Sequence, residues 1–195
     1  MSVVSSLSVG AWVTAIALVF GALAMSIVAR RIRQPLLATV AALPVVVAVL
    51  AIAFGIGLPA PAHALHVLLA LGFAGLGVVA GSPLTALVLR LASNGQAEDG
   101  RFGGILITEN GERTPREVLR GGAWIGYLER LAIVAAIAVG HPEAIAGVIA
   151  VKGLGRFSEL DSAPARERFI IGTLTSMIWA AVCAAIIVLP GGALS

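Results

Sequence analysis

The sequence predicts an all-α fold, a polytopic membrane helix bundle with about six transmembrane helices and both termini outside. Of the 195 residues, 59% are hydrophobic and only 12% are charged, and the mean hydropathy is +1.02. Soluble domains have about 45–50% apolar and about 25% charged residues. Several apolar runs also reach the roughly 18–20 residues that cross ~30 Å of hydrocarbon, and the arginines collect in alternate loops. We therefore expect a multi-pass protein of the cytoplasmic membrane of a bacterium.

Breaks at charged residues, proline and glycine divide the chain into six predicted spans. The spans cover residues 9–29, 36–58, 65–92, 121–140, 143–160 and 168–189. The first is predicted to be a retained helix, because a signal peptide has a basic segment ahead of its apolar run. Here the basic residues Arg30, Arg31 and Arg33 come after that run.

The loops that follow the first, third and fifth spans carry the arginines, whereas "PAPAHALH", "GHPE" and both termini carry no arginine or lysine. By the positive-inside rule, the basic loops are cytoplasmic and both termini lie outside. The net charge of +3 then reflects topology and contacts with anionic membrane lipids. We expect no nucleic-acid partner, because no aromatic residues are interleaved with the basic ones.

The spans form two halves joined by a polar segment. Residues 1–93 are predicted to be a three-helix apolar scaffold, in which Gly72, Gly75, Gly77 and Gly81 let helix backbones approach closely. Residues 121–195 are three helices that carry the intramembrane charges. Pro44 and the prolyl segment "GSPLT" at 81–85 are interpreted as tolerated membrane prolines, with a kink as the alternative.

Residues 94–120 are predicted to be a solvated cytoplasmic loop, with a lid or a surface that docks a protein partner as the alternative. Within it, "ILIT" followed by "ENGE" predicts a short hairpin with an Asn-Gly turn. "TPREVLR" resembles a helix start, with Thr114 as the cap and Pro115 at the first position.

Adjacent ions interrupt the fourth span at Glu129 and Arg130. Because spans four and five turn at "GHPE", Glu129 should lie level with Lys152 and Arg156, whereas Arg130 points about 100° around its helix. Each charge at a helix centre costs about 2.5–3.5 kcal/mol on insertion scales. Three cations and one carboxylate leave a positive surplus, which indicates a mobile anion. The predicted ligand-binding residues are Glu129, Arg130, Lys152, Arg156, Thr173 and Ser176.

The function predicted from these residues is the binding or transport of an anionic small molecule or lipid headgroup at an inner-leaflet pocket. The alternative is a non-catalytic structural or accessory subunit, in which Glu129 bridges Lys152 or Arg156, or a partner subunit supplies the negative charge. A lipid-phosphate enzyme with Glu129 as base is a second alternative. Enzyme activity is not favoured, because the chain has no P-loop, no Gly-x-Ser-x-Gly elbow and no His-Glu-x-x-His pattern. We expect no cofactor.

All three histidines, His63, His66 and His141, fall on the predicted outer side, with Glu143 nearby. They are candidates for a metal site on the outer face, but we interpret them as ordinary interfacial histidines, so that no metal is predicted. The single cysteine, Cys183, lies in an apolar run and excludes an intrachain disulfide.

The stretches "GGAWIGYLERLAIV", "AVKGLGRFSEL" and "RFIIGTLTSMIWA" resemble the C-terminal membrane segment of an uncharacterised bacterial integral-membrane family, a domain of unknown function. The resemblance covers about residues 120–185, and it rests on Gly-x-Leu-Glu-Arg, Lys-x-x-x-Arg-Phe-x-Glu-Leu and Ile-Ile-Gly-Thr motifs. Gly153 stands where that family has a serine. The resemblance implies no activity, but it implies that one set of residues acts together: Glu129, Arg130, Lys152, Arg156, Phe157, Glu159 and Gly172.

Overall fold

A computed structural model describes residues 3–32, 34–57, 62–92, 106–107, 116–117, 122–155 and 163–189. This part of the chain is all-helical apart from one short pair of strands. Its helices are α1 (Val3–Arg31), the 3-10 helix η1 (Pro35–Ala38), α2 (Thr39–Ala53), α3 (His63–Val79), α4 (Gly81–Ala92), α5 (Gly122–Ala138), α6 (Ala144–Gly155) and α7 (Ala163–Val188).

Two of the described helices are long and apolar enough to cross a membrane, over Ser8–Arg31 of α1 and Arg166–Val188 of α7. The bent pair α3 and α4 makes a third if the two are counted as one span. Helices α2 and α6 are apolar but shorter. These helices confirm the all-helical class and indicate a membrane protein, whereas the six spans and the orientation of the termini stay predictions.

The predicted span 65–92 is broken at Ala80, where α3 and α4 meet at a bend of 43°. Pro83, in the first turn of α4, explains the break, because proline has no N–H to donate to the preceding turn and its ring clashes with that turn. The interpretation of "GSPLT" as a tolerated proline segment was therefore wrong. Pro44, in contrast, lies inside the continuous helix α2.

The two short strands pair antiparallel, β1 (Leu106–Ile107) with β2 (Arg116–Glu117). The first strand comes from "ILIT", as the hairpin prediction requires, but the expected Asn-Gly turn lies outside the described residues. The second strand takes in two residues of "TPREVLR", so the helix start predicted there was wrong at Arg116 and Glu117.

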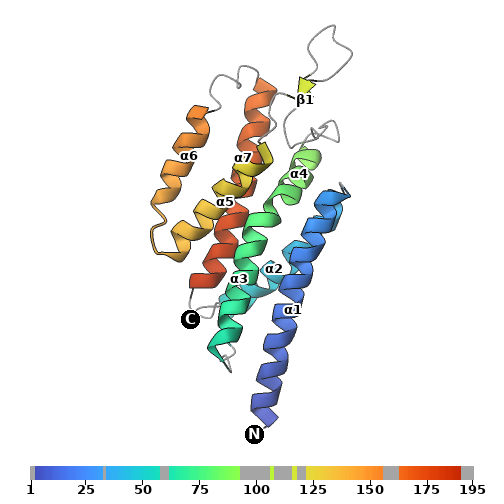
Figure 1. The fold of residues 1–195 in the computed structure, drawn as a ribbon, viewed down its shortest axis with the longest axis vertical. Helices are drawn as coiled ribbons and strands as arrows, with labels where there is room; N and C mark the ends of the chain where they lie inside the picture. The colour runs from blue at the N-terminus through green and yellow to red at the C-terminus, as the bar shows by residue number, and fades with distance from the viewer. Residues whose placement is uncertain are drawn as a thin grey trace.

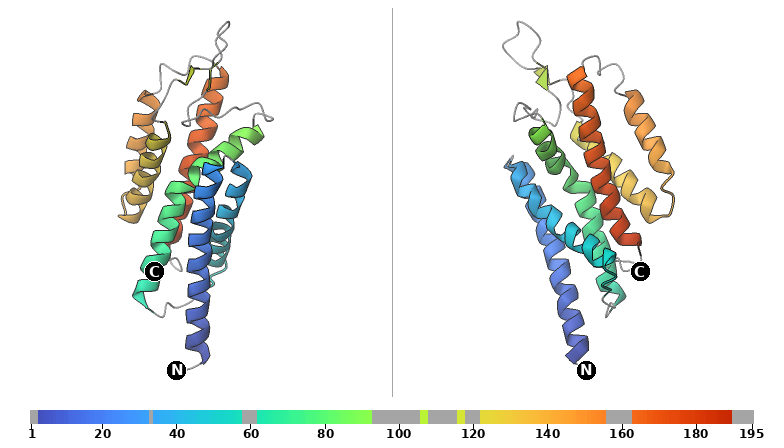
Figure 2. Two further views of the ribbon diagram at one scale, coloured as in Figure 1. Left: turned by 45° about the vertical axis from the view of Figure 1, so that its right-hand side comes forward. Right: turned by 180° about the vertical axis from the view of Figure 1, so that it is seen from behind.

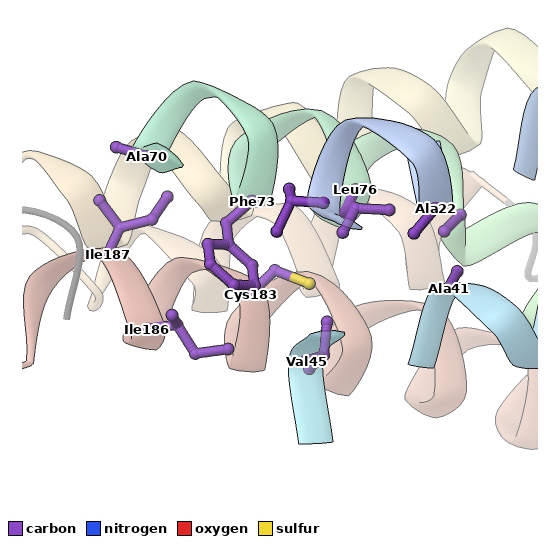
Figure 3. Packing of buried hydrophobic residues seen from close by; sticks show 11 residues of the cluster. Ala22, Ala41, Val45, Ala70, Phe73, Leu76, Cys183, Ile186 and Ile187 are labelled. Carbon is purple, nitrogen blue, oxygen red and sulfur yellow. The ribbon is translucent and has the colours of Figure 1, made fainter. Parts of the chain in front are cut away.

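Helices α3 and α7 run through the middle of the bundle, with α1 and α2 on one side and α5 and α6 on the other (Figures 1 and 2). Helix α7 packs against α3, α4 and α5. The larger apolar core joins α3 and α7 to α1 and α2, and Figure 3 shows Phe73 of α3 beside Cys183 of α7. A second cluster around Ile133 and Met177 joins α5 to α7. Both clusters place α7 at the centre of the fold.

Glycines of α3 bring neighbouring helices close, as the sequence predicts. A Cβ atom on Gly72 would lie 2.6 Å from Cγ1 of Val19 on α1. A Cβ atom on Gly77 would lie 3.1 Å from Cβ of Cys183 and 3.2 Å from Cγ2 of Val134. A larger residue at Gly72 requires Val19 to shift, and one at Gly77 requires Cys183 and Val134 to move apart by a few tenths of an ångström.

We expect Gly72→Ala to lower the free energy of unfolding by about 1–3 kcal/mol, because the new methyl group overlaps Val19. Gly21→Ala is the matched control on α1, since nothing lies within 4 Å of a Cβ atom there. That variant should leave stability unchanged or raise it by up to about 1 kcal/mol. Reversible unfolding of the detergent-purified variants measures both. Equal stability of the two variants would contradict the close packing of α1 on α3.

Candidate functional site

Arg130 is buried in the centre of the bundle, with 3% of the residue exposed. Its guanidinium group donates three hydrogen bonds to groups on other helices. Nε donates to the backbone oxygen of Val78 at 2.6 Å, Nη1 to Oγ of Ser176 at 3.0 Å and Nη2 to Oγ of Ser82 at 2.7 Å. One side chain of α5 thus ties α3, α4 and α7 together.

Two glycines make the space that the arginine occupies. A Cβ atom on Gly81 would lie 2.5 Å from Cδ and 2.9 Å from Nε of Arg130. On α5 itself, a Cβ atom on Gly126, one turn before the arginine, would lie 3.3 Å from Nη1. The long side chain therefore passes directly over the backbone where α4 begins.

The break between α3 and α4 supplies acceptors for this side chain. The last carbonyl groups of a helix have no partner within it and carry the negative end of its dipole. At the end of α3, the oxygen of Val78 accepts from Nε of Arg130. The oxygen of Leu76 accepts the N–H of Ala80 at 3.0 Å and also Nε1 of Trp179 at 2.9 Å. The broken helix therefore offers a partly negative end to a buried cation.

All three acceptors of the Arg130 guanidinium are neutral. Among the residues that the structure describes, Lys152 forms an ion pair with Glu129, and His141 forms a hydrogen bond with Glu143. Neither contact includes Arg130. Removing an unpaired ion from water costs several kcal/mol. The dipole of α3 offsets only part of this, since such an effect is worth up to about 2 kcal/mol. The carboxylate of Glu129 also attracts the guanidinium group of Arg130, but it is already paired with Lys152. The described side chains thus leave a positive surplus at Arg130 and Arg30.

The guanidinium groups of Arg30 and Arg130 both lie near the aromatic ring of Tyr127. The Cζ atom of Arg130 lies 5.2 Å from the centroid of the Tyr127 ring, and the Cζ atom of Arg30 on α1 lies 4.8 Å from the same centroid. The sequence gives Arg30 only as a topology signal, because nothing in it says which residue of α5 the end of α1 approaches. Tyr127, one turn before Arg130, was likewise not predicted to contribute.

Glu129 and Lys152 form an ion pair between α5 and α6, in which the side chains are 10% and 18% exposed. The ammonium group also lies 6.0 Å from the ring centroid of Phe169 on α7. This pairing agrees with the register that the hairpin turn predicts. It neutralises both charges, and it lies on a different side of α5 from the contacts of Arg130.

The remaining predicted pocket residues have different outcomes. Arg156 lies outside the described residues. Thr173 is partly buried on α7 and makes none of the hydrogen bonds of Arg130, whereas Ser176, one turn further on, makes one of them. The single predicted pocket is therefore divided into two groups, one around Arg130 and one around the Glu129–Lys152 pair. A ligand at either group stays a prediction.

The three histidines do not come together. His66 packs on Trp12, with ring centroids 4.6 Å apart, and His141 bonds to Glu143 at 2.9 Å across the α5–α6 turn. His63 is exposed at the start of α3. No group of three or more His, Cys, Asp or Glu side chains in the described ranges is placed to hold a metal ion. The Glu143 backbone N–H and the imidazole of His141 hydrogen-bond the carboxylate, and they hold the pKa of Glu143 below its ordinary value.

Comparison of the chain with protein-family models, with curated proteins and with solved structures finds no match. The resemblance of residues 120–185 to an uncharacterised membrane family therefore stays a prediction. Phe157 and Glu159, which that resemblance implies, lie outside the described residues.

Proposed function

We propose that this protein is a multi-pass protein of a bacterial cytoplasmic membrane that binds or transports an anion at Arg130, either a small anion or a lipid headgroup. One observation carries the proposal, namely the buried guanidinium group whose three acceptors are all neutral. A charge in this position is more stable with an anion beside it than without one. The distribution of arginines supports six spans with both termini outside.

The chemistry of the side chain supports an anionic ligand. A guanidinium group has five N–H donors, so donors remain after the bonds to Val78, Ser82 and Ser176. Arginine is also the side chain best suited to carboxylate and phosphate groups, because its planar fork can bind two oxygens at once. Arg30 adds a second cation at the same ring.

The broken helix supports the same proposal. Interrupted helices within membranes occur where protein or a water-filled cavity surrounds the break, and transporters use such breaks to form ligand sites. Here the break at Ala80 is directly beside the buried arginine. The bend between α3 and α4 therefore lies beside the guanidinium group of Arg130, the charge for which we propose an anionic partner.

The test is Arg130→Gln, which keeps a hydrogen-bonding side chain but removes the charge. We expect at least about a tenfold loss of the anion that stays bound after gentle extraction, because a charge-assisted hydrogen bond is worth about 1.5–3 kcal/mol. Native mass spectrometry of the purified protein measures the loss. Arg90→Gln, at an exposed arginine at the end of α4, is the control and should retain the anion. A folded Arg130→Gln protein that retains it equally would contradict the proposal.

A non-catalytic structural or accessory subunit is the second candidate function, and the Glu129–Lys152 pair favours it. Both charges are satisfied within the chain and hold α6 to α5. Such a pair needs no ligand. A protein partner at residues 94–120 stays a prediction, because only four residues of that segment are described.

A further inference from the structure

The exposed cation beside the Arg130 group is Arg30, at the end of α1. Its guanidinium group and that of Arg130 both contact the ring of Tyr127. Arg30 is exposed and Arg130 is buried, so one edge of this group reaches the surface of the bundle. The two like charges repel each other, and the carboxylate of Glu129, which attracts Arg130, is itself paired with Lys152. An anion at the exposed edge would therefore relieve the remaining repulsion.

The surface at this edge has the composition of a membrane–water boundary. Trp124, one turn before Tyr127, is 73% exposed and meets its ring edge-on, with centroids 6.1 Å apart. Tryptophan and tyrosine are enriched at the level of lipid headgroups, and arginine near a helix end extends to the same level. Ile27, one turn before Arg30 on α1, is exposed and apolar. So is Leu131, one turn after Tyr127 on α5. The exposed edge of the site therefore combines cations with aromatic and apolar side chains, the composition that suits a lipid headgroup and its acyl chains.

We infer that the anion at this site is the phosphate group of an inner-leaflet phospholipid that carries a net negative charge. The phosphate accepts hydrogen bonds from Arg30 and balances the charge of Arg130, and the acyl chains lie on the exposed apolar faces of α1 and α5. A net negative headgroup is favoured over a zwitterionic one, because a choline group brings a third cation to the cluster. This inference rests on the proposed function, and it adds the ligand class and a second binding residue.

The experiment titrates the detergent-purified full chain with phosphatidylglycerol, phosphatidylcholine or inorganic phosphate and follows bound molecules by native mass spectrometry. We expect a single phosphatidylglycerol to bind more tightly than phosphatidylcholine, and inorganic phosphate not to displace it. Arg30→Gln should weaken phosphatidylglycerol binding roughly tenfold, the effect of one charge-assisted hydrogen bond. Because Arg30 is exposed, this variant should fold, and a thermal melt checks that it does.

Arg31→Gln is the matched control, since it removes the same charge from the next residue of α1. Arg31 is also exposed, and the guanidinium groups over the Tyr127 ring are those of Arg30 and Arg130. We expect less than about a twofold change in binding from it, because surface charges contribute little individually. An equal effect of the two variants means non-specific attraction and overturns the inference.

The outcomes also separate this inference from the proposed function. If inorganic phosphate displaces the ligand, with binding unchanged in Arg30→Gln and lost in Arg130→Gln, a free anion binds at Arg130. The inference then fails and the proposed function stands. Binding that survives Arg130→Gln in a folded protein overturns both.

Discussion

Lys152→Met is expected to lower the free energy of unfolding by about 3 kcal/mol. The substitution leaves the carboxylate of Glu129, only 10% exposed, without its cation. Breaking a buried ion pair by removing one partner typically costs about 3–5 kcal/mol. The lower end of this range applies here because both side chains are partly exposed. Unfolding of the purified variant in mixed detergent measures the change. Val151→Met, at an exposed neighbouring position on α6, is the control and should change stability by less than about 0.5 kcal/mol.

The double variant Glu129→Leu with Lys152→Met should recover most of that stability. Replacing both members of a buried pair by apolar residues of similar size is often neutral or stabilising. A double variant that loses as much as the two single variants combined would show that the pair does not act as a unit. The amount of anion that stays bound to the double variant also separates the two candidate functions. If the stable double variant retains the anion, the ligand lies at Arg130 and not at the Glu129–Lys152 pair.

The helices were predictable because apolar run length is a local property of the sequence. The pairing of Glu129 with Lys152 was predictable for a related reason, since a short turn between adjacent helices fixes which residues lie level. The helix ends were less predictable. Residues 36–58 were predicted to be one span, but α2 ends at Ala53, where a turn with positive φ at Gly55 follows. That turn depends on conformational freedom rather than on hydropathy.

The surroundings of Arg130 could not be predicted in the same way. Its three acceptors lie 46, 48 and 52 residues away in the sequence, and no periodicity states which faces of distant helices meet. The bend at Ala80 is a tertiary effect too. A proline inside a membrane helix is tolerated or becomes a break according to what takes up the carbonyl groups that it leaves free. Pro83 itself frees the carbonyl of Val79. The neighbouring carbonyl of Val78, at the end of α3, accepts from Arg130, so the break and the buried charge lie together.

Gly81→Ala tests that mutual dependence, and we expect it to have the largest effect of the glycine substitutions. The new Cβ atom would lie 2.5 Å from Cδ and 2.9 Å from Nε of Arg130, so the arginine must move. It cannot move far without losing the hydrogen bond from Nε to Val78. Overpacking of a core costs about 1–3 kcal/mol, and a lost charge-assisted hydrogen bond adds about 1.5–3 kcal/mol. We therefore expect a decrease of about 3 kcal/mol or more in the free energy of unfolding, measured in detergent.

Two further variants make this prediction specific to the arginine. Gly172→Ala adds the same atom where the nearest neighbours are at ordinary contact distances of 3.5 and 3.6 Å, so it should change stability by less than about 0.5 kcal/mol. In the Arg130→Leu background the shorter side chain does not reach across α4, and Gly81→Ala should then have little additional effect. If Gly81→Ala destabilises both backgrounds equally, the glycine is required by the bend itself. If the effect disappears with the arginine, the small residue at the start of α4 exists to admit a buried cation.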